Sequence, residues 1–98
     1  MGHEILLAPE AQQAFQGLPA RIRSEVRDAL EVHMRCEPRK VSRSRIKRLR
    51  GISRPQYRLR VGDIRVFYDV TETTVEILAV IPKAAAQAWL DTEGTPSR

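Results

Sequence analysis

Cysteine is almost absent from this chain of 98 residues, since Cys36 is its single example. One cysteine excludes an internal disulfide and a cysteine-rich metal site, and it fits a reducing compartment. No apolar stretch approaches the roughly eighteen residues that cross a bilayer. The opening run MGHEILLAPEAQQ has too few apolar residues and no preceding charged region for a signal peptide. We therefore expect a cytoplasmic protein with no membrane association.

Acidic residues are nearly missing from residues 35–54, where Glu37 is the only one beside nine Lys and Arg. The net charge is +8 in this stretch and +5 in the whole chain, so the remaining residues sum to −3. Such a local excess favours an anionic partner such as nucleic acid, an acidic protein or a membrane surface. Because apolar residues are also few, we expect a mobile connection here. A solvated loop that only aids solubility is the alternative.

The rest of the chain predicts a regular order of elements. Apolar spacing predicts a strand at 3–8, helices that begin near Pro9 and Pro19, and strands at 56–61, 64–70 and 75–81. Pro82 and Gly94 bound an alanine-rich C-terminal helix, and residues 95–98 form a polar tail. The order β-α-α-β-β-β-α without internal repeats predicts a single domain, residues 1–98.

The stretch YRLRVGDIRVFY, residues 57–68, predicts a hairpin, because Gly62 and Asp63 suit a two-residue turn. Directly opposed residues share a face of a sheet. One face then carries Tyr57, Leu59, Val61, Ile64, Val66 and Tyr68, which is a core face. The other face carries Arg58, Arg60, Arg65 and Phe67.

The three arginines of this hairpin gather on one face with no acidic residue placed among them. Arg60 lies opposite Arg65, which costs stability unless an anion lies between them. Guanidinium groups donate paired hydrogen bonds to phosphate, so the cluster suits a phosphate ligand. Two alternatives stay open: the arginines extend into water, or acids from elsewhere pair with them, with Glu76 as one example.

The last predicted strand is apolar on both sides, which is typical of a central strand. Strict alternation assigns its residues to two sides. One side carries Val75, Ile77, Ala79 and Ile81, and the other carries Glu76, Leu78 and Val80.

The run KRLRGISRPQYRLRVGDIRVFYDV, residues 47–70, together with the helical hairpin and the element order, resembles the RelE/ParE toxin superfamily. The resemblance covers nearly the whole chain. It implies an α+β fold in which a small twisted antiparallel sheet packs on the N-terminal helical hairpin. It also implies the toxin of a type II toxin–antitoxin system, with an acidic RelB-like antitoxin as partner and no cofactor.

The RelE-like branch of this superfamily cleaves mRNA on the ribosome without a metal and so inhibits translation. The RNA's own 2′-hydroxyl attacks the adjacent phosphate, and basic residues stabilise the developing charge. The resemblance places Arg58, Arg60, Arg65 and Lys83 at these catalytic positions. Contacts to nucleic acid are expected from Lys47, Arg48, Arg50, Arg54 and Trp89.

Two departures from the RelE-like pattern keep other functions open. Lysine is frequent in relatives where this chain has Arg58 and Arg60, and arginine is a poor general base. Trp89 falls near the place of a tyrosine that assists proton transfer, whereas tryptophan can only stack on a base. His33 is expected on the long helix, away from the arginines. The alternatives are a ParE-like DNA gyrase inhibitor and a catalytically blunted member that only binds RNA or antitoxin.

Overall fold

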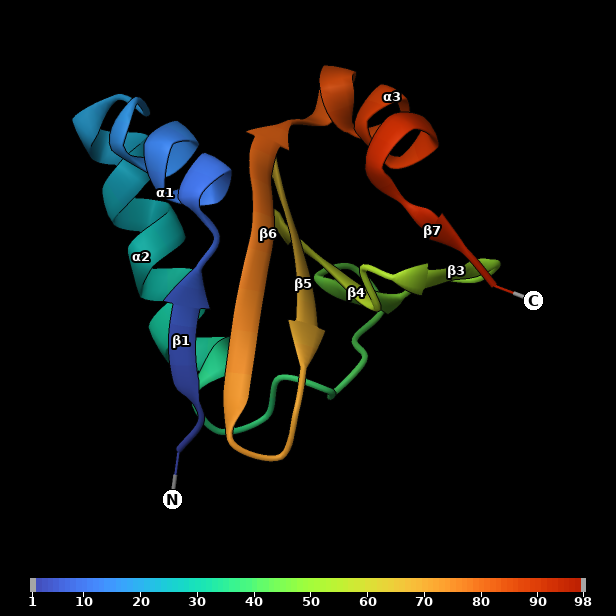
Figure 1. Ribbon diagram of the computed structural model, residues 1–98. Coiled ribbons are helices and arrows are strands. Elements are labelled where there is room, and N and C mark those ends of the chain that lie inside the picture. The colour runs from blue at the N-terminus through green and yellow to red at the C-terminus, as the bar shows by residue number, and fades with distance from the viewer. Residues whose placement is uncertain (1, 98) are drawn as a thin grey trace.

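The computed structural model describes residues 2–97 and confirms the α+β class (Figure 1). Its helices are α1 (Pro9–Gln16), α2 (Ala20–Met34) and α3 (Lys83–Glu93). Its strands are β1 (Glu4–Leu7), β2 (Ile46–Arg48), β3 (Ile52–Arg54), β4 (Tyr57–Val61), β5 (Ile64–Val70), β6 (Thr74–Pro82) and β7 (Thr95–Pro96). Over this part of the chain, no helix combines the length and apolar character needed to cross a membrane.

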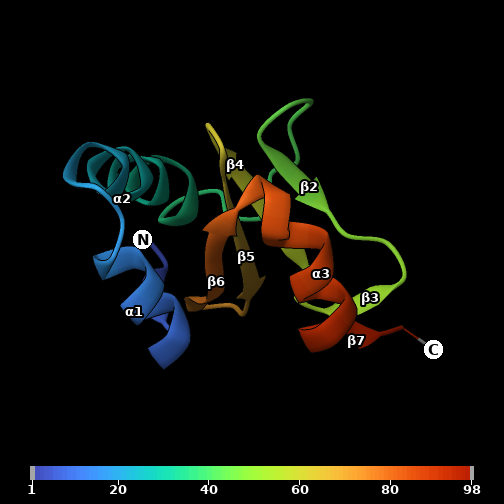
Figure 2. The same ribbon diagram turned by 90° about the horizontal axis from the view of Figure 1, so that it is seen from above.

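Five strands form the main sheet, in the order β1-β6-β5-β4-β2. β1 runs parallel to β6, whereas the other neighbours are antiparallel. The α1–α2 hairpin lies on one side of this sheet. α3 and the small β3–β7 pair lie on the other side (Figures 1 and 2). The predicted packing of a sheet on an N-terminal helical hairpin is therefore confirmed.

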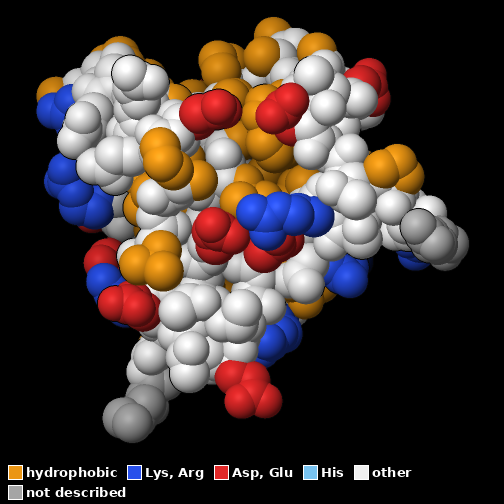
Figure 3. Space-filling view, in the orientation of Figure 1, with side chains coloured by type: hydrophobic (Ala, Val, Ile, Leu, Met, Phe, Trp, Pro, Cys, Tyr) orange, Lys and Arg blue, Asp and Glu red, His pale blue; other side chains and the backbone are white. Residues whose placement is uncertain are grey.

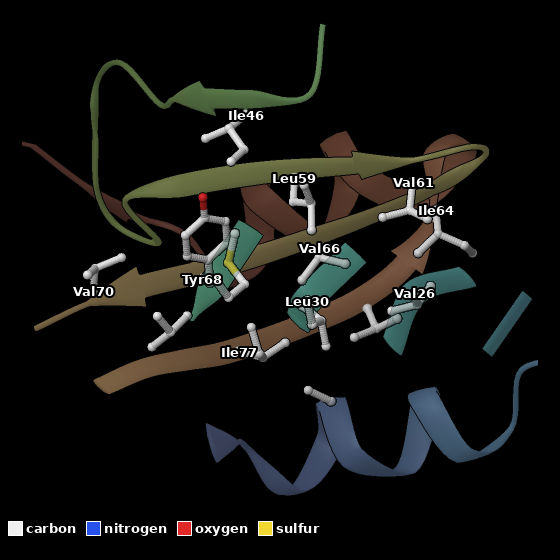
Figure 4. Close-up of a cluster of buried hydrophobic side chains, with 14 residues drawn as sticks. Val26, Leu30, Ile46, Leu59, Val61, Ile64, Val66, Tyr68, Val70 and Ile77 are labelled. Carbon is white, nitrogen blue, oxygen red and sulfur yellow. The ribbon is translucent and has the colours of Figure 1, made fainter. Parts of the chain in front are cut away.

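The hydrophobic core lies between the sheet and the helical hairpin (Figure 4). From α2, Val26, Leu30 and Met34 pack against the sheet, and none of them is more than 5% exposed. A buried side chain of this size stabilises the fold by about 1.5–3 kcal/mol. All of the residues that the hairpin pattern assigns to the core face belong to this cluster or pack against it: Tyr57, Leu59, Val61, Ile64, Val66 and Tyr68.

The β4–β5 hairpin has the predicted register. Its pairs run from Tyr57 opposite Tyr68 to Val61 opposite Ile64. Gly62 has a φ of 58°, the left-handed conformation that a tight two-residue turn requires and that glycine adopts without strain.

Strand β6 departs from strict alternation. Phe67 pairs with Ala79, but the next residue, Tyr68, pairs with Ile77, so Leu78 is an extra residue in β6. Such a bulge moves the residues beyond it to the opposite side of the sheet. The prediction that one side of the sheet carries Val75, Ile77, Ala79 and Ile81 is therefore wrong. The central position of this strand, between β1 and β5, is confirmed.

The basic segment 35–54 is not a mobile connection, because it contains β2 and β3. Ile46 is only 3% exposed and pairs with Leu59 of β4. The buried Tyr68 hydroxyl donates a hydrogen bond of 2.8 Å to the carbonyl oxygen of Pro38. These two contacts thus order a segment whose high charge led us to expect a mobile connection. The sequence did not reveal β2 and β3 because strands of three residues are too short to show periodicity.

The predicted polar tail, residues 95–98, is also corrected. Thr95 and Pro96 form β7, which pairs with Arg54 and Ile52 of β3. Residue 98 lies outside the described residues. The chain after α3 is therefore attached to the basic segment rather than free in solvent.

Candidate nucleic-acid interface

Strand register gathers four cations on the side of the sheet that faces away from the helical hairpin. Arg60 pairs with Arg65, and Arg58 pairs with Phe67 on one side and with Lys47 of β2 on the other. Paired side chains project from the same side of a sheet. We call these five residues the arginine face. The predicted grouping of the three arginines is confirmed, and β2 adds Lys47 beside them.

Arg58 lies at the centre of the arginine face and is only partly exposed. Its Nε is buried and finds no hydrogen-bond partner within residues 2–97. Burial lowers the pKa of the Arg58 guanidinium, and the charges of Arg65 and Arg60 lower it further. A buried donor without a partner costs free energy, more so when it is charged. An anion bound against the exposed part of this guanidinium relieves the repulsion among the three arginines.

Arg65 is held firmly at the turn end of the arginine face. Its side chain is buried, and Nη1 donates to the carbonyl oxygens of Gly62 at 2.9 Å and Ile64 at 3.2 Å. Arg60 is exposed opposite it. The face therefore combines one guanidinium fixed by backbone carbonyls, one partly desolvated guanidinium and one exposed guanidinium.

No carboxylate in the described chain forms an ion pair with Arg58, Arg60 or Arg65. Glu76, the acid considered as a neutraliser, instead accepts a hydrogen bond from Arg54 at 3.2 Å. Glu76 therefore does not neutralise the charge of the three arginines. The arginine face keeps its positive charge, which suits a phosphate of an external ligand.

α3 closes one side of the arginine face. Its first backbone N–H, that of Lys83, donates to the carbonyl oxygen of Asp63 at 2.7 Å, so the helix starts beside the β4–β5 turn. Trp89 stacks on Phe67 with ring centroids 5.2 Å apart and planes 6° apart. An exposed lysine at the turn end and an aromatic pair beside Arg58 thus border the cluster.

Two of the other predicted contact residues lie elsewhere. Arg48 pairs with Tyr57 on the side of the helical hairpin, and its guanidinium carbon lies 5.1 Å from the centre of that ring. Arg50 is exposed in the connection between β2 and β3. Neither joins the arginine face. The sequence predicted Lys47 as a nucleic-acid contact but did not place it beside Arg58. That placement requires β2 to be identified as a strand.

The five residues of the arginine face include no histidine, cysteine or carboxylate. His33 lies on α2, on the far side of the sheet, where burial and then the charge of Arg45 lower its pKa. No cluster of three His, Cys, Asp or Glu that could hold a metal ion occurs in residues 2–97. The chemistry that the arginine face offers is therefore binding and stabilisation of negative charge.

Comparison with known proteins identifies the family and the fold. Residues 5–86 match the family model of the ParE toxin of the type II toxin–antitoxin system, parDE. The RelE–RelB complex from Pyrococcus horikoshii OT3 has a chain 30% identical, with a TM-score of 0.60 over 85% of this chain and 97% of that chain. The RelB–RelE antitoxin–toxin complex from Methanococcus jannaschii has a chain 20% identical, with a TM-score of 0.65 over 86% and 96%. The search of curated proteins found no match.

Proposed function

Because this chain belongs to the ParE toxin family of type II toxin–antitoxin systems, we propose that it inhibits translation by cleaving mRNA on the ribosome. Family membership makes the chain a toxin, and the solved relatives are complexes with an antitoxin, which supports an antitoxin partner here. RNA as the target, and cleavage as the action, are the proposal.

The observation that carries the proposal is the partly buried Arg58, which has no ion-pair partner among the described residues and is surrounded by other cations. Like charges in direct register destabilise a sheet. A protein that keeps such a cluster free of ion pairs gains a surface that matches a phosphate, because guanidinium groups donate parallel hydrogen bonds to its oxygens. Single-stranded RNA presents such phosphates along an exposed backbone.

In the proposed reaction the 2′-hydroxyl oxygen of one nucleotide attacks the adjacent phosphorus. A new bond forms to the 2′-oxygen, and the bond to the 5′-oxygen of the next nucleotide breaks. The products are a 2′,3′-cyclic phosphate and a 5′-hydroxyl, and the proton lost from the 2′-hydroxyl ends on the 5′-oxygen. Arg58, Arg60 and Arg65 stabilise the charge that builds on the phosphate oxygens. We assign the proton transfers to water or to ribosomal groups.

Lys83 and Trp89 have supporting roles in this proposal. Lys83 adds a cation at the turn end of the arginine face, where α3 begins. Trp89 extends an aromatic pair with Phe67 beside Arg58, and a flanking RNA base can stack on such a ring.

The test is cleavage of mRNA in translating ribosomes, mapped by primer extension. The triple variant Arg58→Ala, Arg60→Ala, Arg65→Ala removes three charges from the arginine face. The matched control Arg21→Ala, Arg39→Ala, Arg43→Ala removes three exposed charges elsewhere. We expect new 5′ ends with the wild type and the control, and a loss of at least about a hundredfold in the first variant. Growth arrest without new 5′ ends contradicts the nuclease function.

Inhibition of DNA gyrase is the second candidate. It is favoured by Trp89, which stands on α3 where a proton-transferring tyrosine is expected in the nuclease branch. A gyrase inhibitor tolerates loss of the arginine-face charges, so the same triple variant still blocks supercoiling by purified gyrase. If neither assay responds and the folded wild type causes no growth arrest, a blunted RNA- or antitoxin-binding member is the remaining account.

A further inference from the structure

We propose that Arg54 is a positioning residue that holds Asp69 and Glu76 away from the arginine face and so keeps that face positively charged. The inference rests on the proposed RNA-binding function. It assigns Arg54 a role within the protein instead of the direct nucleic-acid contact that the sequence predicts.

One guanidinium bridges two carboxylates on neighbouring strands. Arg54 of β3 donates from Nη1 to Asp69 Oδ2 of β5 at 2.6 Å and from Nη2 to Glu76 Oε1 of β6 at 3.2 Å. Asp69 and Glu76 are themselves paired in the β5–β6 register. In Figure 3 a basic side chain lies against acidic ones near the centre of the face shown.

Asp69 lies within reach of the arginine face. Along β5, Val66, Tyr68 and Val70 belong to the core, so Phe67 and Asp69 project from the other side. Arg58 pairs with Phe67, which makes Asp69 its diagonal neighbour. Diagonal neighbours in a sheet are close enough for long side chains to meet. A released Asp69 carboxylate therefore has a ready partner in the Nε of Arg58.

Arg54 and the backbone together satisfy both oxygens of Asp69. Oδ2 accepts from Arg54, and Oδ1 accepts the backbone N–H of Gln56 at 2.8 Å. The Asp69 side chain is 15% exposed and the Arg54 side chain is 51% exposed, so the carboxylate is largely desolvated while the guanidinium stays half in water. While these bonds persist, the carboxylate gains nothing by turning to Arg58.

The position of Arg54 depends in turn on the C-terminal segment. Arg54 pairs with Thr95 of β7, and the Ser53 hydroxyl donates to the carbonyl oxygen of Thr95 at 3.2 Å. β7 directly follows α3, the helix that carries Trp89. The strand that follows α3 thus also holds Arg54, the residue that binds the two acids.

RNA affinity separates the two roles of Arg54. The probe is a short fluorescent single-stranded RNA at constant salt, and affinity is read by anisotropy. We expect Arg54→Gln to weaken binding by about tenfold, since one released carboxylate opposes the phosphate. Adding Asp69→Asn and Glu76→Gln to Arg54→Gln is expected to restore binding to within about threefold of the wild type. If Arg54 contacts RNA directly, the triple variant stays weak, and that result overturns the proposal.

A second readout involves no RNA and therefore stands apart from the proposed function. The Arg58 Nε–Hε signal is followed by ¹H–¹⁵N NMR. We expect it to shift and to exchange more slowly in Arg54→Gln, because Asp69 then bonds to it, and to return in Arg54→Gln with Asp69→Asn. An Arg58 signal unchanged by Arg54→Gln overturns the inference even if RNA binding is observed.

A conservative variant guards against loss of the fold. Arg54→Lys retains one charge, which can hold one carboxylate at a time, so we expect intermediate RNA affinity and a smaller shift of the Arg58 signal. Thermal unfolding accompanies each measurement. If Arg54→Gln only disturbs β3, stability falls and RNA affinity does not recover when Asp69→Asn and Glu76→Gln are added. That result also contradicts the proposal.

Discussion

The two faces of the central sheet are built from the same strands but differ in burial and in charge. On the covered face, Leu59, Val66 and Tyr68 are fully buried against the helical hairpin. On the opposite side, their neighbours Arg58 and Arg65 stand together, and neither forms an ion pair with a carboxylate of the described residues. The difference shows that alternation lets one strand serve stability on one face and charge on the other.

The energies of the two faces are unequal. Each buried apolar side chain contributes about 1.5–3 kcal/mol. A like-charge pair in direct register costs about 1 kcal/mol or less. The covered face therefore outweighs the arginine face, and the fold tolerates a cluster that its own residues do not neutralise. The predictions below run from the largest expected effect on stability to the smallest.

Removing a central side chain of the covered face should have the largest effect. Leu59 is 0% exposed, and we expect Leu59→Ala to lower the free energy of unfolding by about 2–5 kcal/mol, because a cavity remains. Urea unfolding measures it. The control is Leu6→Ala on the edge strand β1, where the side chain is 47% exposed and the expected loss is below about 1 kcal/mol. Equal losses contradict this view of the core.

The aromatic pair on the opposite side should contribute less. Trp89→Ala removes the stack on Phe67, and we expect a loss of about 1–2 kcal/mol in the free energy of unfolding. Circular dichroism follows the unfolding, since Trp89 is the only tryptophan of the chain. Trp89→Phe keeps a stacking ring and should retain most of the stability. A loss as large as that of Leu59→Ala places Trp89 in the core instead.

The anchor between the covered face and the basic segment is the Tyr68 hydroxyl. Tyr68→Phe removes its hydrogen bond to Pro38, and we expect a loss of about 1 kcal/mol by urea unfolding at pH 7.

The same residue also predicts a dependence on alkaline pH. Burial raises the pKa of Tyr68 above its ordinary value of 10.0, and the neighbouring Tyr57 adds to this. As pH rises, Tyr68 therefore loses its proton in the unfolded chain before it does so in the folded chain. The contribution of Tyr68 to the free energy of unfolding is complete below about pH 10 and is lost as pH rises above that value. Thermal unfolding between neutral and alkaline pH measures the loss. The Tyr68→Phe variant should lose less stability than the wild type over the same pH range. Equal slopes of stability against pH in the two proteins contradict the assignment of this effect to Tyr68.

The smallest effect should have the opposite sign. Arg60→Glu places an acid opposite Arg65, and we expect the free energy of unfolding to rise by about 0.5 kcal/mol at low salt while RNA binding falls. Thermal unfolding at low and high salt measures it, because screening removes the gain. Arg43→Glu, on an exposed loop position, is the control and should change stability little. A destabilised Arg60→Glu protein contradicts the claim that the arginine face is strained by charge.

Much of the arginine face was predictable because it is local. Strand alternation and a Gly-Asp turn determine the register of β4 and β5, and those facts lie within residues 57–68. The helical hairpin was predictable for the same reason, since apolar spacing and Pro9 and Pro19 mark it. The short strands β2, β3 and β7 were missed because two or three residues show no periodicity and their pairing partners lie far along the chain.

The sequence by itself determined which residues of each strand share a face and that three arginines meet on one of them. Only the tertiary structure decided that Lys47 lies beside Arg58, that a bulge at Leu78 reverses part of β6, and that Arg54 engages Asp69 and Glu76. The reason is physical. Side-chain alternation follows from local backbone geometry, whereas strand neighbours, bulges and ion pairs between distant segments depend on how the whole chain buries its apolar surface.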